Sequence, residues 1–155
     1  MGPGMRLRRE VVGHMNSVCT LSVTSFSLPA DLKSSSRIRG AAAGVAREAG
    51  LSSSRIYDLQ VAVSEAVASA IEYCCLPGDE VRVEVAWLTD RLEVRIHSPR
   101  PYSAALGPRL LSHQGGFGLP LMASLADQVI VRRRVGGGAT LAVVFSLAPC
   151  GLPTG

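Results

Sequence analysis

One stretch, from Asp58 to Cys75, has the apolar spacing of a helix buried along one broad face. Its apolar residues recur at steps of three and four: Leu59, Ala62, Val63, Ala66, Val67, Ala70, Ile71 and Cys74. Glu65, Ser69 and Tyr73 follow at steps of four, so they lie along one side of this helix. A carboxylate is costly to bury without a partner. Glu65 is therefore expected at the solvent boundary or in a site that uses its charge.

The length and composition of the chain predict one domain with a short tail at each end. With 155 residues, 47% of them hydrophobic, the chain has enough apolar material for a single core. We expect a flexible N-terminal tail over residues 1–16, the domain over 17–148 and a C-terminal tail over 149–155. No apolar run approaches the about 20 residues that cross a bilayer, so we expect a cytoplasmic protein with no membrane partner.

The spacing of the cysteines argues against a metal site, and the distribution of charge argues against a nucleic-acid site. The four cysteines lack the spacing of metal ligands and are expected to be free thiols or small buried side chains. The net charge of +4 is mild, and the arginine clusters at residues 6–9 and 132–134 are short, with no interleaved aromatic residues. We therefore expect no direct binding to nucleic acid.

Taken in order, the chain has the element pattern of an α+β protein. Alternation predicts strands over residues 17–28, 80–87, 92–97, 128–135 and 139–147. Helices are expected from Pro29 or Asp31 to Ala49, after the possible caps Ser52–Ser54, and over 119–126. Residues 98–113 read as a long loop, and such loops are often functional. Antiparallel hairpins with helices gathered on one face make a two-layer α/β sandwich.

Four features with chemical potential follow one another along the chain. Glu65 lies on the long helix, and the predicted strand over residues 92–97 ends at the Ser-Pro-Arg-Pro segment 98–101. The run Gly115-Gly116-Phe117-Gly118 opens the short helix, and a glycine turn at 136–138 precedes Ala139-Thr140. Glycines before a helix let the backbone approach a phosphate, whose charge the free N–H groups attract. The glycine run is weak evidence alone, whereas the ordered set is specific.

The ordered set resembles the anti-sigma-factor serine kinases of bacteria, a branch of the GHKL, or histidine-kinase-like, ATPase superfamily. The resemblance covers residues 21–147: AVSEAVASAIEY resembles the N box, RLEVRIHSPRP the strand and loop of the next box, GGFGLPLMASLADQVIV the glycine box and its helix, and GGGATLAVVF the closing strand pair. It implies the Bergerat fold, in which a mixed, mostly antiparallel sheet carries its helices on one face.

The resemblance also implies roles for two residues of the long helix. Glu65 matches the general base, which needs its carboxylate within about 3 Å of the acceptor proton. Ser69 stands where the family has an asparagine that binds magnesium. A serine hydroxyl is shorter than an amide carbonyl, and Mg²⁺ tolerates little misplacement of its oxygen ligands, so Ser69 is only a weak metal candidate.

The remaining matches concern the nucleotide. The aspartate that recognises adenine in the family falls near Ile96 to Ser98, where Ser98 brings no charge, and Arg100 or Pro99 replaces the glycine of that box. The resemblance places five more positions in the nucleotide site: Gly115, Gly116, Gly118, Leu119 and Thr140. Losing one charge-assisted hydrogen bond costs about 1.5–3 kcal/mol, which is about tenfold or more in affinity. We therefore expect weakened binding of ATP and Mg²⁺.

Three functions remain open from the sequence. The first is an anti-sigma regulatory factor that binds a sigma factor, an anti-sigma antagonist, or both, and forms a homodimer as the resemblance implies. The alternative is an active ATP-Mg-dependent kinase that phosphorylates a serine of the antagonist. A fragment of a histidine kinase is disfavoured, because His14, His97 and His113 are expected in tails or loops and not on a dimerisation helix.

Overall fold

The computed structural model describes residues 8–10, 18–101 and 118–147. They form a six-stranded sheet in the order β1-β2-β3-β4-β6-β5, with every pairing antiparallel. The strands are β1 (Arg8–Glu10), β2 (Thr20–Pro29), β3 (Glu80–Leu88), β4 (Arg91–Ser98), β5 (Gln128–Arg133) and β6 (Ala139–Ser146). The helices are η1 (Leu32–Ser34), α1 (Ser35–Glu48), α2 (Ser53–Cys74) and α4 (Gly118–Leu125).

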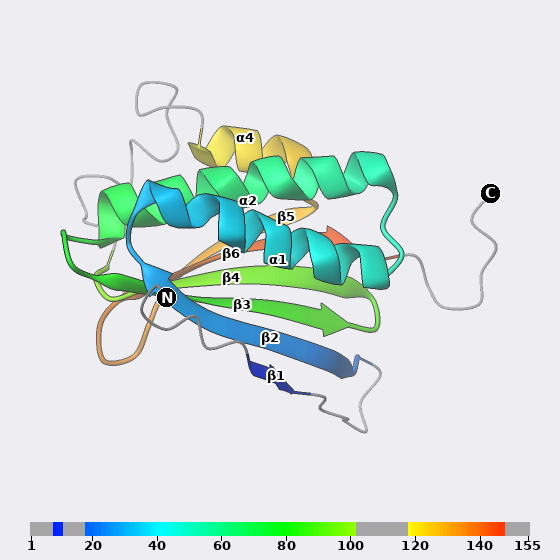
Figure 1. Ribbon diagram of the computed structural model, residues 1–155, viewed down its shortest axis with the longest axis horizontal. Coiled ribbons are helices and arrows are strands. Elements are labelled where there is room, and N and C mark those ends of the chain that lie inside the picture. The colour runs from blue at the N-terminus through cyan, green and yellow to red at the C-terminus, as the bar shows by residue number, and fades with distance from the viewer. Residues whose placement is uncertain (1–7, 11–17, 102–117, 148–155) are drawn as a thin grey trace.

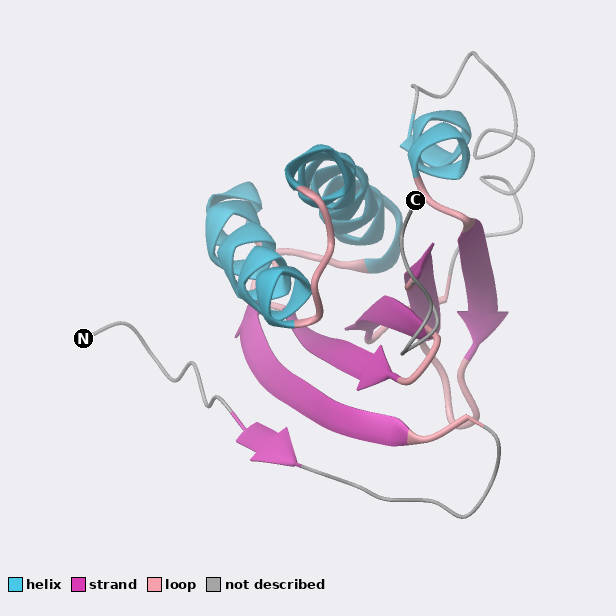
Figure 2. Cartoon of the chain, turned by 90° about the vertical axis from the view of Figure 1, so that its right-hand side faces the viewer, coloured by secondary structure: helices cyan, strands magenta, loops and turns pink. Residues whose placement is uncertain are grey.

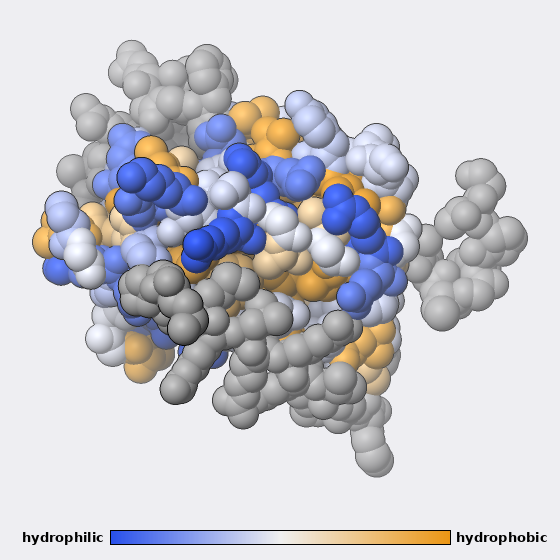
Figure 3. Space-filling model, viewed as in Figure 1, coloured by the Kyte–Doolittle hydropathy of each residue, from blue (hydrophilic) through white to orange (hydrophobic). Residues whose placement is uncertain are grey.

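The helices lie together on one face of the sheet, as Figures 1 and 2 show. This confirms the expected α+β two-layer sandwich, although the described strands pair only in antiparallel fashion and not in a mixed sheet. Figure 3 shows hydrophilic side chains over α1 and α2, interrupted by small apolar patches. No helix in the described part of the chain is both long and apolar enough to cross a membrane.

The predicted hairpin of β3 and β4 has one face covered, as its alternation indicates. Val85 pairs with Val94, and both are buried against the helices. On the neighbouring register positions Glu84 pairs with Arg95, and this pair points to the face without helices. The period of two therefore assigns each side chain of this hairpin to the correct face.

Both long helices begin and end at residues that the sequence marks. Ser52 caps α2 by accepting from the backbone N–H of Arg55 at 3.3 Å, so the helix starts five residues before the clearest apolar repeat. Gly50 follows α1 with φ of 86°, a conformation that favours glycine. The serine-rich start expected for α1 is a separate 3-10 turn, η1, capped by Asp31.

The N-terminal region differs from the expectation of a flexible tail over residues 1–16. Arg8–Glu10 form the short edge strand β1, which pairs with β2 at Arg9 and Thr24. Three residues are too few to show an alternation, and the free edge of β2 provides their hydrogen-bond partners. Residues 102–117 and the tail over 149–155 lie outside the described residues, so the predicted long loop and C-terminal tail stay predictions there.

Candidate functional site

The side of α2 that carries Glu65 and Ser69 faces α4. Arg55, on this same side near the start of α2, donates to the carbonyl oxygen of Leu125 at 3.0 Å and to Oδ2 of Asp127 at 2.7 Å. Ser69 lies fourteen residues later, close to four helical turns, and therefore has nearly the same direction from the helix axis. Glu65, one turn before Ser69, lies between this side and the outer surface.

Gly118, the last residue of the glycine run, begins α4. Figure 1 shows α4 alongside α2 and running in the opposite direction. Seven residue steps from Leu125 back to Gly118 cover about 10 Å of helix. Gly118 thus lies toward the central turns of α2, where Glu65 lies. Gly115 and Gly116 lie outside the described residues, and nothing is described of the Leu119 side chain.

Ser69 and Glu65, the two candidate site residues of α2, differ in how far they are buried. Ser69 is 6% exposed, whereas Glu65 is half-buried and presents its carboxylate near the surface. No three His, Cys, Asp or Glu side chains of the described chain gather as a metal site. The described carboxylates, imidazoles and thiols therefore build no metal cluster around the Ser69 hydroxyl, and this single short oxygen is a poor fit to the octahedral oxygen set that Mg²⁺ demands.

Ser98, at the end of β4, is buried and engaged within the protein. It is 2% exposed, and its hydroxyl forms a hydrogen bond with the Cys75 thiol just after α2. Burial raises the pKa of the Cys75 thiol, and the bond with Ser98 offsets part of that effect. The backbone of Gly138 packs on the same residue: a Cβ at Gly138 would lie 2.4 Å from the carbonyl oxygen of Ser98. Ser98 is thus enclosed from two sides.

Arg100 is also engaged within the protein. Its Nε donates to Oδ2 of Asp79 at 2.9 Å, and its backbone N–H donates to the carbonyl oxygen of Cys74 at 3.2 Å. The bond to Arg100 lowers the pKa of Asp79, and the backbone N–H of Leu76 adds to this effect. Arg100 therefore joins the end of β4 to the connection between α2 and β3.

Thr140 lies away from the other candidates. It pairs with His97 in the sheet register, on the face opposite the helices, and its hydroxyl contacts Nδ1 of His97 at 2.7 Å. Nε2 of His97 contacts Glu84 on the same face. The structure thus does not bring Thr140 together with Glu65 and Ser69, in contrast to the placement expected from the resemblance. His97 lies within β4, as the predicted strand over residues 92–97 implies, and not in a tail or loop.

A model of a known protein family matches most of this chain. The model of the histidine kinase-like ATPase domain matches residues 28–145, from the end of β2 to β6. The chain belongs to this family.

Relatives of this ATPase domain include several serine-protein kinases. The chain is 32% identical over 133 residues to serine-protein kinase RsbW of Bacillus pumilus, covering 76% of this chain and 82% of the relative. It is 34% identical over 113 residues to RsbW of Bacillus subtilis, covering 64% of this chain and 71% of the relative.

A solved structure shares the fold of the ATPase domain. The crystal structure of the RsbU and RsbW domains of Rv1364c from Mycobacterium tuberculosis aligns with a TM-score of 0.55 and 16% identity. The alignment covers 84% of this chain and 34% of that longer chain. At this identity, the similarity shows the fold alone.

Several residues that shape the site of this ATPase domain gave no signal in the sequence. Cys75 and Asp79 engage Ser98 and Arg100, and Arg55 fixes α4 against α2 while its guanidinium lies 4.8 Å from the centre of the Phe145 ring. These contacts join positions 20 or more residues apart, so no local pattern announces them. The Pro-Gly-Asp turn at 77–79 marked only the end of α2.

Proposed function

We propose that this ATPase domain is an anti-sigma regulatory factor that holds a sigma factor or an anti-sigma antagonist, with a weakened pocket for ATP and Mg²⁺. The observation that carries the proposal lies at the end of β4. There the Ser98 hydroxyl is hydrogen-bonded to the Cys75 thiol, and the Arg100 guanidinium is bonded to the Asp79 carboxylate. Side chains at the positions of the family's adenine box thus serve the fold. Relatives named serine-protein kinases support descent from a nucleotide-dependent regulator.

Ser69 and Ser98 should each lower the affinity for nucleotide. Ser98 supplies no carboxylate for a base amino group, and Ser69 supplies a short hydroxyl in place of an amide. If each change costs about 1.5 kcal/mol, the two together weaken nucleotide binding about a hundredfold. A protein-binding surface needs neither residue. The fold can therefore retain partner binding while nucleotide affinity falls.

Two measurements test the proposal. Isothermal titration with ATP-Mg²⁺ should give no heat at micromolar nucleotide and at most weak binding at millimolar concentration. A sigma factor from the same genome should co-purify with the wild-type chain and equally with Glu65→Ala. Tight ATP-Mg²⁺ binding, or loss of the complex in Glu65→Ala, would count against a weakened pocket with an independent partner surface.

An active serine kinase is the second candidate, because Glu65 remains half-buried on the α4 side of α2. A carboxylate there can accept a proton from a serine hydroxyl, directly or through water. Transfer of radiolabelled γ-phosphate to a candidate antagonist, abolished by Glu65→Gln, would favour this function. The absence of transfer at millimolar ATP-Mg²⁺ would exclude it.

The proposed regulator acts as a homodimer in the cytoplasm. The homodimer is proposed from the likeness to the regulatory kinases, and the described residues identify no interface. Light scattering after size-exclusion chromatography tests it, because a homodimer has twice the chain mass of 16.3 kDa.

A further inference from the structure

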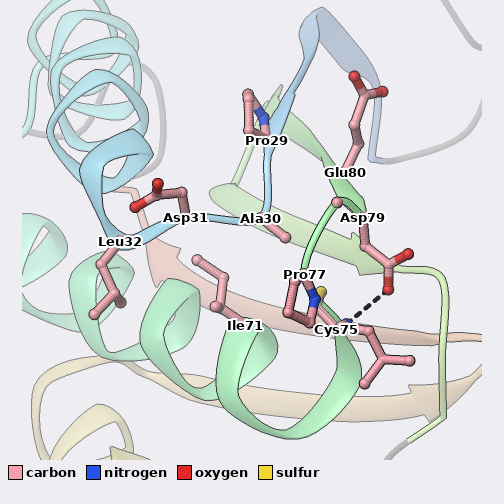
Figure 4. Close-up of a pocket in the computed structure, with 11 residues that line it drawn as sticks. Pro29, Ala30, Asp31, Leu32, Ile71, Cys75, Pro77, Asp79 and Glu80 are labelled. Atoms are coloured by element: carbon pink, nitrogen blue, oxygen red, sulfur yellow. Dashed lines mark hydrogen bonds between the residues drawn. The ribbon is translucent and has the colours of Figure 1, made fainter.

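A groove lies on the side of α2 opposite Glu65 and Ser69, and two of its lining residues, Cys75 and Asp79, are the partners of Ser98 and Arg100. Ile71 at its floor is two residues from Ser69, which is about 200° around the helix. One wall is the end of β2 with η1, and the other is the connection from α2 to β3 (Figure 4). The cavity measures about 580 Å³, within the usual range for a binding pocket.

Hydrogen bonds between its walls hold the groove open in one shape. The backbone N–H of Ala30 donates to the carbonyl oxygen of Asp79 at 2.8 Å and so joins the two walls. Within one wall, the N–H of Leu76 donates to Oδ2 of Asp79 at 2.8 Å. In the other, the Ser34 hydroxyl donates to the carbonyl oxygen of Pro29 at 2.9 Å. A groove fixed in this way loses little conformational freedom when it binds a ligand.

Two large apolar side chains that line the groove are exposed to solvent. Leu32 is 63% exposed and Leu76 is 53% exposed, and each comes from a different wall. Between them, Ile71 is partly buried and packs against the core. Figure 4 shows Leu32, Ile71 and Pro77 around the same hollow. Exposed apolar side chains that gather in a concave site are typical of protein-binding surfaces.

The charge of the groove is negative, although the chain carries +4 overall. Asp31, Asp79 and Glu80 line it, and no lysine, arginine or histidine does so among its described lining residues. The last turn of α2, whose carbonyl groups carry partial negative charge, contains no basic residue. Arg100 pairs with Asp79, whereas Asp31 and Glu80 form no ion pair with a described residue. Two copies facing each other here would bring acid against acid.

We propose that this groove binds a short segment of a partner protein in which lysine or arginine side chains flank two or three apolar side chains. The apolar side chains of the segment fill the space between Leu32 and Leu76, and its cations face Asp31 and Glu80. The inference rests on the proposed function only in needing a protein partner. It places that partner on the side of α2 away from Glu65.

A synthetic peptide tests this surface directly. The probe is a fluorescent twelve-residue peptide with leucines on one helical face and lysines beside them. One control peptide has glutamate for every lysine, and another has serine for every leucine. Fluorescence anisotropy gives the affinity for the full chain, and methyl NMR reports which of Leu32, Ile71 and Leu76 shift.

Two groove variants and two matched controls accompany the probe. Leu76→Ser and the pair Asp31→Asn with Glu80→Gln should each weaken binding about tenfold, because they remove an apolar contact or the rim charge. The Asp31→Asn change keeps an oxygen for the cap at Lys33. Val135→Ser and Asp90→Asn, at exposed positions elsewhere, should leave affinity unchanged. Circular dichroism verifies that each variant is folded.

The expected result is binding of the basic peptide alone, with methyl shifts confined to the groove and affinity that falls with salt. The proposal is overturned if neither peptide binds, if the acidic peptide binds equally, or if the groove variants bind like wild type. A change of oligomeric state in Leu76→Ser would instead assign the groove to a second copy. If the peptide fails while a sigma factor still co-purifies, the groove proposal falls and the proposed function stands.

Discussion

Arg100 donates from Nε to Oδ2 of Asp79 across 2.9 Å, and this bond ties the end of β4 to the loop after α2. The same aspartate accepts the N–H of Leu76 and, through its backbone, holds the end of β2 at Ala30. Three segments of the chain therefore meet at one residue. The resemblance predicts a glycine of the nucleotide box near Arg100, and in this chain the arginine at that position has a role in the fold.

Removing either partner of this pair should lower the urea midpoint of unfolding. Asp79→Ala should lower it more than Arg100→Ala, because only the aspartate also accepts the Leu76 N–H. The double variant should lose less than the sum of the two single variants, since the pair can be broken only once. Strictly additive losses would show that the two side chains do not interact in solution.

Ser69→Asn should strengthen the binding of ATP-Mg²⁺. The amide carbonyl reaches further than the hydroxyl and restores the family's magnesium ligand, so affinity should rise about tenfold by isothermal titration. Ala68→Asn, one residue earlier on α2 and pointing elsewhere, is the matched control and should change nothing. Equal affinities for wild type and Ser69→Asn would show that position 69 does not limit nucleotide binding.

Gly138→Ala should destabilise the fold more than Gly136→Ala. Both glycines have positive φ, 92° and 88°, so both substitutions carry the strain of a left-handed conformation, about 1 kcal/mol. Only at Gly138 would the new Cβ meet the Ser98 carbonyl oxygen at 2.4 Å, and we expect a further loss of about 1–3 kcal/mol. Denaturation in urea measures both, and equal losses would contradict the close contact.

Arg55→Ala should reduce the free energy of unfolding by about 2 kcal/mol. The substitution removes donors to Leu125 and Asp127 and the guanidinium over Phe145, and it frees α4 from α2. Arg47→Ala, on the exposed surface of α1, should change stability by less than about 0.5 kcal/mol. A loss no greater than that of the control would show that the contacts of Arg55 do not stabilise the packing of α4.

Acidification should remove the stabilisation that Glu84 provides. The bond to His97 lowers the pKa of Glu84 from its ordinary value of 4.5, an effect that outweighs the burial that opposes it. A carboxyl group with a lowered pKa in the folded state stabilises the fold above its unfolded pKa, and this contribution is lost as the pH falls through the folded value. The stability difference between wild type and Glu84→Gln should therefore be larger at pH 7 than at pH 3, whereas a constant difference would contradict the argument. Glu80→Gln, on the same strand, is the control.

Local periodicity predicted most of the fold, and long-range contacts account for what it missed. The helix around Glu65 and the hairpin of β3 and β4 were predictable because each has one buried face and a clear period. The face of Thr140 was not, because β6 lies inside the sheet and is buried on both faces, with Leu141 and Ala142 both covered. A strand of this kind has no alternation from which the direction of a side chain can be inferred.

The candidate site was predictable only along α2. Spacing of four placed Glu65 and Ser69 on one side of that helix, and the packing of α4 agrees with it. The bonds of Ser98 with Cys75 and of Arg100 with Asp79 join segments that approach only after folding. The resemblance predicts that Ser98 and Arg100 are altered positions, and no local pattern predicts the partners that their side chains contact.

The strand order has a consequence for biosynthesis. Among the described strands, β5 pairs with β6 alone, and β6 lies between β4 and β5, so β5 has no place in the sheet until β6 has been made. Ribosomes deliver the N-terminal part first, and β2, β3 and β4 can pair as they emerge. The arginine-rich strand β5 therefore stays unpaired until residues 139–146 have emerged, whereas α4 can already pack against α2.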